Sequence, residues 1–219
     1  MSWFDLKPYL RAKEVVDIRQ PMGSIDNNML VDTNILWFCY YPHYSQLDLL
    51  GRGPVEYQIT QYPSFLKKLL SSETVLFVHK IGLLEFANTV ERAELQLLYL
   101  KVKEVSEIGD DFKPKDLRHT YPEQYRIIQG QLATYMHSIK KTFELLGNDI
   151  PIDQLLAEFF LEWQDSLADV GDAMMIAQAK LKGISSVLSD DADLASLKDI
   201  RLYTANNAAV SAYKAIHKD

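Results

Sequence analysis

Acidic residues in this sequence recur where short apolar runs end or helices are expected to begin. Asp32 and Asp191 each follow an apolar run, and Glu85 and Asp172 each lie at the start of a predicted helix. Carboxylates that share a cleft repel one another, and a bound cation relieves that repulsion. Oxygen ligands without His or Cys favour a hard cation, Mg²⁺ or Mn²⁺. The acids therefore predict a divalent metal site.

A hard cation with open coordination positions suits hydrolysis of a phosphodiester. It lowers the pKa of a bound water and stabilises charge on the phosphorus and on the leaving oxygen. Two other classes stay open, a non-catalytic binding or assembly module and a Mg²⁺-dependent phosphohydrolase. The phosphohydrolase normally needs an Asp-x-Asp motif, whereas Thr33 and Asn34 follow Asp32. A decayed binding module usually loses acids, and all four are present here.

The elements that must position these acids alternate between short apolar strands and helices. That alternation predicts an α/β fold with a central parallel sheet covered on both faces, and sites at the carboxyl ends of its strands. The predicted strands are 29–31, 75–78, 185–188 and 200–203. The predicted helices are 64–70, 83–105, 122–146, 153–163, 172–182, 191–197 and 206–217, and residues 42–62 are predicted to be a loop.

The helix predicted over 122–146 has the clearest end signals. Thr120 and Glu123 fit a capping box with Pro122 in the first turn, and Gly147 stands where a C-cap glycine belongs. This helix lies in a stretch at 105–165 that we expect to form an inserted helical subdomain.

Four motifs, taken together and in order, resemble those of PIN-domain nucleases, the family that includes the VapC-type toxin ribonucleases. The motifs are MLVDTNIL at 29–36, LEFAN at 84–88, GDAMMIAQA at 171–179 and VLSDDADL at 187–194. The resemblance covers roughly residues 28–90 and 168–206. It implies a three-layer PIN-like fold and a Mg²⁺- or Mn²⁺-dependent endoribonuclease that leaves a 5′-phosphate and a 3′-hydroxyl.

The resemblance also implies roles for individual residues. The catalytic metal ligands are Asp32, Glu85, Asp172 and Asp191, with Asp193 as a further, less critical acid. Ser189 stands where the family usually has Thr. The supporting residues expected around the acids are Thr33, Asn34, Asn88, Asp169, Ser189 and Asp190.

Partners follow from the same resemblance. RNA is the expected substrate, and an antitoxin protein and a second copy of the chain are candidate partners. No apolar run reaches the length of about 18 residues that a membrane-spanning helix needs, so we expect no membrane association and a cytoplasmic location.

Length and charge bound the remaining organisation. The chain has 219 residues, one cysteine and a net charge of −7, which excludes a disulfide framework and coating of nucleic acid by bulk charge. We expect an N-terminal extension at 1–28 with one short helix, then one domain at 29–219. Residues 113–141 contain six basic and two acidic residues with interleaved tyrosines. The RNA contacts predicted there are Lys113, Lys115, Arg118 and Arg126, against the alternative of a solvated helix face.

Overall fold

A single parallel sheet forms the centre of the molecule in the computed structural model, which describes residues 5–48, 53–105, 112–147 and 149–217. Within these ranges the sheet has six strands in the order β1-β6-β5-β2-β3-β4, and every neighbouring pair is parallel. The strands are β1 (Glu14–Asp17), β2 (Asn28–Val31), β3 (Val75–Val78), β4 (Glu144–Leu145), β5 (Ser186–Leu188) and β6 (Arg201–Thr204). The predicted α/β class is confirmed.

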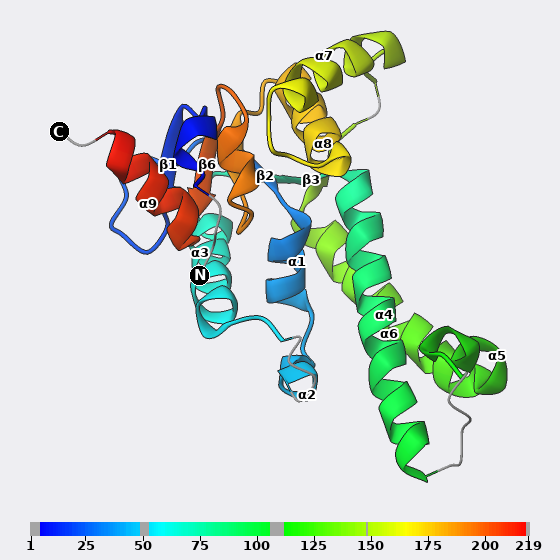
Figure 1. Cartoon of the computed structure of the whole chain (residues 1–219). Coiled ribbons are helices and arrows are strands. Elements are labelled where there is room, and N and C mark those ends of the chain that lie inside the picture. Colours follow the sequence, from blue (N-terminus) through cyan, green and yellow to red (C-terminus); the bar gives the residue numbers. More distant parts are fainter. Residues whose placement is uncertain (1–4, 49–52, 106–111, 148, 218–219) are drawn as a thin grey trace.

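Helices cover both faces of this sheet (Figure 1). The α-helices are α1 (Thr33–Tyr40), α2 (Tyr44–Asp48), α3 (Glu56–Leu70), α4 (Lys80–Val105), α5 (Leu117–Thr120), α6 (Pro122–Thr142), α7 (Ile152–Gln164), α8 (Val170–Leu181) and α9 (Asn207–Ile216). Three 3-10 helices join them, η1 (Lys7–Tyr9), η2 (Pro114–Asp116) and η3 (Asp193–Ser196).

The central strand β2 shows why the sheet is buried on both sides. Successive side chains of a strand point to opposite faces. Leu30 packs in the core under α8 and α9, whereas Met29 and Val31 pack in the core under α1, α3 and α4. All three side chains are at most 1% exposed. An apolar run without alternation is therefore what this three-layer arrangement requires.

A helical arm extends from one side of the sheet. It consists of the second half of α4 together with α5 and α6 (Figure 1). Its own small core contains Leu95, Val102, Leu117 and Ile128. The predicted insertion at 105–165 differs from this arm. The arm begins within α4, β4 pairs with β3 in the sheet, and α7 packs against α8.

The end of α6 differs from the prediction. The helix ends at Thr142, and Phe143 adopts an extended conformation that leads into β4. The backbone N–H of Leu146 then donates to Val78, which continues the pairing with β3. Pairing with the sheet therefore replaces the last predicted turn, and Gly147 lies beyond the helix rather than at its C-cap.

The predicted capping box is also wrong. Thr120 belongs to α5, and its hydroxyl donates to the carbonyl of Asp116 at 3.1 Å. It cannot cap α6, whose N-cap residue is Tyr121 and has no side-chain cap. Pro122 does lie in the first turn, as predicted. No sequence pattern predicted α5, and the Thr120 hydroxyl that the capping box requires forms its hydrogen bond within that helix instead.

Two segments were predicted with too little structure. The extension contributes η1 and also β1, which pairs with β6 and so belongs to the sheet. The predicted loop at 42–62 contains α2 and the first half of α3, a helix that continues through Pro63. Tyr62, Phe65, Leu66 and Leu69 bury one side of α3, and this apolar side stabilises the helix despite its proline.

The other helix ends shift by a few residues. The helix predicted at 172–182 begins at Val170, and the one predicted at 191–197 is the shorter 3-10 helix η3. Within the described residues, no helix combines the length and the apolar character needed to cross a membrane.

Candidate functional site

Asp32 is the innermost residue of the candidate site. It follows β2, caps the N-terminus of α1 and is 5% exposed. One carboxylate oxygen accepts the backbone N–H of Thr33. The other accepts the side-chain amide of Asn34 at 2.7 Å and the hydroxyl of Ser189 at 2.6 Å. These donors come from α1 and from the end of β5, so two elements fix the direction of the carboxylate.

Glu85 reaches the same place from α4. The helix begins at Lys80, so Glu85 lies in its second turn rather than the predicted first. The hydroxyl of Thr33 donates to its carboxylate at 3.0 Å. Gly82 allows this approach, because a Cβ atom there would lie 2.9 Å from the Thr33 hydroxyl oxygen. Thr33 thus links the first acid to the second.

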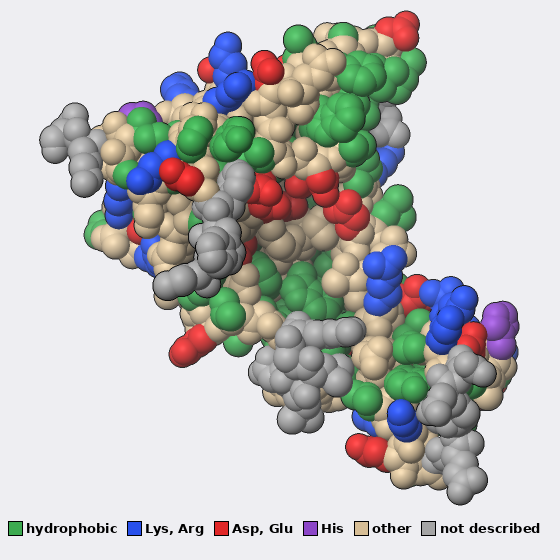
Figure 2. All heavy atoms as spheres, in the orientation of Figure 1, with side chains coloured by type: hydrophobic (Ala, Val, Ile, Leu, Met, Phe, Trp, Pro, Cys, Tyr) green, Lys and Arg blue, Asp and Glu red, His purple; other side chains and the backbone are tan. Residues whose placement is uncertain are grey.

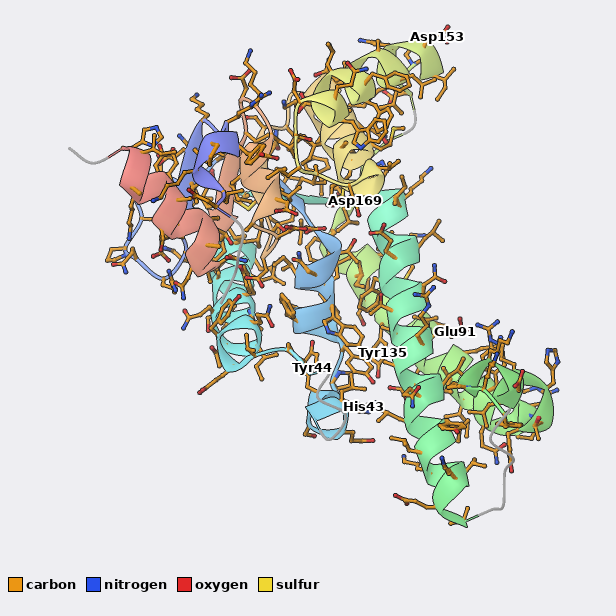
Figure 3. All side chains as sticks on the ribbon, in the orientation of Figure 1. His43, Tyr44, Glu91, Tyr135, Asp153 and Asp169 are labelled. Carbon is orange, nitrogen blue, oxygen red and sulfur yellow. The ribbon has the colours of Figure 1, made fainter. Side chains whose placement is uncertain are left out.

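Asp169 and Asp172 stand at the N-terminus of α8. Asp169 is the N-cap residue, and its carboxylate accepts the backbone N–H of Asp172 at 2.9 Å. A Cβ atom on Gly171 would lie 3.1 Å from a Glu85 oxygen and 3.2 Å from an Asp169 oxygen. Both carboxylates therefore border one small space between α4 and α8, and Figure 3 shows Asp169 beside the first turns of α4.

The turn after β5 supplies the remaining acids. The backbone N–H of Asp191 donates to the Ser189 hydroxyl at 2.9 Å, and the Asp191 carboxylate accepts the backbone N–H of Asp193 at 2.8 Å. Since Ser189 also holds Asp32, this turn and the end of β2 are joined. Burial, followed by the Asp191 charge, raises the pKa of Asp193.

Charge repulsion connects these carboxylates. Burial, helped by the charges of Asp191 and Glu85, raises the pKa of Asp32 to about 6, although the hydrogen bonds from Ser189 and Thr33 oppose the shift. For Asp172, burial is again the largest cause. The charges of Asp32, Asp169, Asp191 and Glu85 add to it, and its pKa rises to about 8. The charges of these carboxylates, which are distant in the sequence, thus act on one another in the folded chain.

Figure 2 shows acidic side chains gathered on an open surface where α1, α4 and α8 meet. In the described part of the chain, no three His, Cys, Asp or Glu side chains already have the arrangement of a metal site. The donor set nevertheless suits a hard cation, because every candidate ligand is a carboxylate and a cation would offset the repulsion described above.

Asp190 has a different environment from the other acids. It is 8% exposed and accepts hydrogen bonds from Tyr57, Gln58 and Tyr62, all on α3. No sequence pattern pointed to these three residues, because they lie in the predicted loop and are more than 120 positions away from Asp190. Asp190 therefore belongs to a buried network beside the acidic cluster. This acidic cluster consists of Asp32, Glu85, Asp169, Asp172 and Asp191.

The predicted RNA contacts lie on the arm, away from the acidic cluster. Arg118 pairs with Glu91 at 2.8 Å and lies over the ring of Tyr125. Arg126 pairs with Glu123 at 2.5 Å. These two guanidinium groups are thus already engaged, whereas the other two predicted contacts, Lys113 and Lys115, are exposed.

Asn88 lies between the acidic cluster and the arm. It follows Glu85 by about one turn of α4, is exposed, and borders a groove of about 330 Å³ between α4 and α6. A cavity of about 580 Å³ lies elsewhere, next to Arg11 and Lys180. These two cations are paired, since Arg11 contacts Asp165 and Lys180 contacts Glu162. The geometry therefore gives the acidic cluster, not this cavity, as the candidate site.

Comparison with known proteins finds similarity to solved structures only. No family model and no curated protein matches the chain. The chain is similar to the crystal structure of FitAcB from Neisseria gonorrhoeae, at 14% identity and a TM-score of 0.44. The alignment covers 82% of this chain and 99% of the other.

Proposed function

We propose that this chain is a Mg²⁺- or Mn²⁺-dependent endoribonuclease of the PIN-like type. The observation that carries the proposal is the convergence of acids from separate elements, Asp32 after β2, Glu85 on α4, Asp172 on α8 and Asp191 after β5. Their charges act on one another, as the raised pKa values of Asp32 and Asp172 indicate. A cation is the simplest partner for such a set.

The four acids would hold the cation from different depths. Asp32 is buried and fixed by Ser189 and Asn34, so it would define the base of the site. Glu85 is exposed and oriented by Thr33, so it would lie at the rim. When bound, a divalent cation supplies activation of water and stabilisation of charge on the phosphate. The open rim favours a polymer as substrate over a small molecule, which enzymes usually enclose.

Incubation with three substrates tests this proposal. Purified chain should cleave RNA in Mn²⁺ or Mg²⁺ and not in EDTA, and the products should carry a 5′-phosphate. Hydrolysis of a phosphomonoester without RNA cleavage would favour the phosphohydrolase. Mn²⁺ binding without any cleavage would favour a binding module. Parallel assays on DNA establish the substrate class. An antitoxin partner and a homodimer stay predictions.

The two exposed arm lysines allow a test of substrate grip. The double variant Lys113→Glu/Lys115→Glu should raise the apparent Kd for single-stranded RNA, because it removes positive charge from the predicted contact surface. Each lost phosphate contact should lower the slope of log Kd against log salt by about 0.7. Fluorescence anisotropy at several salt concentrations measures both effects.

A matched control uses Lys67→Glu/Lys68→Glu, which makes the same charge change at two exposed positions of α3. The control variant should bind RNA like the parent. Equal weakening in both pairs would indicate a bulk charge effect and remove the arm from the proposal. Arg118 is left unchanged, because its ion pair with Glu91 joins α4 to α5.

A further inference from the structure

Asp190 and Asp191 are neighbours in the sequence, but their carboxylates have different partners. The charge of Asp191 raises the pKa of both Asp32 and Asp172, so Asp191 belongs to the acidic cluster. The Asp190 carboxylate is instead enclosed by donors from α3, which is not otherwise part of the site.

The Asp190 carboxylate is directed toward α3 and accepts hydrogen bonds on both of its oxygens. One carboxylate oxygen accepts the hydroxyl of Tyr62 at 2.6 Å and that of Tyr57 at 3.1 Å. The other accepts the Tyr57 hydroxyl at 3.0 Å and the side-chain amide of Gln58. Three donors from one helix thus converge on this carboxylate, with the Tyr57 hydroxyl shared between its two oxygens, and the residue is only 8% exposed.

The backbone of Asp190 is fixed as well. Its N–H donates to the side-chain oxygen of Asn34 at 3.2 Å, and its carbonyl accepts the side-chain amide of Asn206 at 2.6 Å. The residues on either side are those that matter for the cluster. Ser189 donates to Asp32 and accepts from the backbone of Asp191. Any rotation at Asp190 would therefore redirect both acids.

Tyr62 connects this turn to the rest of the fold. Its side chain is fully buried, and its hydroxyl donates to Asp190 while it accepts the backbone N–H of Ala205 at 2.9 Å. The hydroxyl thus joins α3, the end of β6 and the turn after β5. Burial, and then the hydrogen bond to Asp190, raises the pKa of Tyr62, so the phenol keeps the proton that it donates.

We infer that Asp190 is a positioning residue, which α3 holds through Tyr57, Gln58 and Tyr62 so that the turn 189–191 directs Asp191 and Asp32 toward the cation. Asp190 itself does not bind the cation. The inference rests on the proposed function for the cation, but the geometry that it describes is independent of RNA cleavage. Helix α3 then sets metal affinity without touching the metal.

Two substitutions test the inference in the full chain. Asp190→Asn places an NH₂ group against donors, and Tyr62→Phe removes one donor while keeping the ring. Each should raise the Kd for Mn²⁺ by about 10- to 100-fold, as the loss of residues that orient metal ligands typically does. Calorimetric titration of Mn²⁺ into metal-free protein, well below each variant's Tm, measures this. Tyr213→Phe on α9 is the control, and it should bind Mn²⁺ like the parent.

The outcomes separate the possible roles of Asp190. A loss of Mn²⁺ affinity confined to Asp190→Asn, with parental affinity in Tyr62→Phe, would show that the donors of α3 do not set the affinity and would overturn the inference. A lower Tm with parental Mn²⁺ affinity in both variants would show a purely structural role and also overturn it.

If the parent chain binds no Mn²⁺, the proposed function is refuted. The positioning role is then tested by a second measurement that needs no metal. Amide hydrogen exchange at Asp190 and Asp191 should be faster in Tyr62→Phe than in the parent or in Tyr213→Phe. Unchanged exchange at both amides would overturn the positioning role.

Discussion

Replacing Asp32 or Asp172 with Asn should reduce Mn²⁺-dependent RNA cleavage by about 10³-fold. A metal ion supplies several kcal/mol of transition-state stabilisation, and each 1.36 kcal/mol is a factor of ten in rate. Asn keeps the shape of the side chain but loses the charge that would hold the cation. At position 32, the Asn side chain would also direct its NH₂ group at the donors of Asn34 or Ser189, so a hydrogen bond would be lost. Initial rates under saturating RNA measure the loss.

The control for this prediction is Asp153→Asn, the same substitution at an exposed acid on α7, far from the cluster in Figure 3. It should leave the rate unchanged. Circular dichroism and the Tm of each variant show whether the fold is intact. A folded Asp172→Asn protein with parental activity would exclude Asp172 as a ligand and would leave the chemistry to the remaining acids.

The metal-free protein should become more stable when Asp172 is replaced with Asn. Because the pKa of Asp172 rises from 3.8 to about 8 in the folded chain, the folded state binds more protons than the unfolded state between these values. The free energy of unfolding is therefore higher at low pH, where Asp172 is protonated, and it falls as the pH rises toward 8. At pH 7.5 in EDTA, Asp172→Asn should raise the Tm, by about 2–4 °C for each kcal/mol of relieved repulsion.

Mn²⁺ should reverse this order. In the parent chain a bound cation stabilises the folded state by mass action, so the Tm should rise with Mn²⁺ concentration. Asp172→Asn should respond less, and the parent should then be the more stable of the two. Differential scanning calorimetry between pH 5 and 8 measures the Tm of the parent and of the variant, each in EDTA and in Mn²⁺. A parental Tm that does not fall between pH 5 and 8 in EDTA would contradict the proposed repulsion.

The predictable part of the fold came from runs of residues buried on both sides. Met29–Val31 and Val75–Val78 have no polar alternation, which is typical of strands inside a three-layer fold. β1 and β4 gave weaker signals, because they lie at the two edges of the sheet and are held there by pairing with β6 and β3. Edge strands depend on tertiary contacts that no local pattern encodes.

The candidate site divides in the same way. Asp32 and Asp191 could be found because acids after buried strands meet at one edge of a parallel sheet. The contact between Thr33 and Glu85, and the donors from α3 to Asp190, could not be found. They join residues 52 and 133 positions apart and depend on how helices pack over the sheet. Sequence patterns thus pointed to the candidate acids and to Thr33, Asn34 and Ser189 beside Asp32, but not to the contacts between helices that orient Glu85 and Asp190.

The uninterrupted length of α4 has a mechanical consequence. Twenty residues separate Glu85 from the last residue of the helix, and at 1.5 Å per residue this is about 30 Å. A continuous helix resists bending over such a distance, so it acts as a spacer of constant length. A ligand bound at the outer end of the arm would therefore lie about 30 Å from Glu85. Because Glu85 belongs to the same helix, a tilt of the arm would also change the position of its carboxylate.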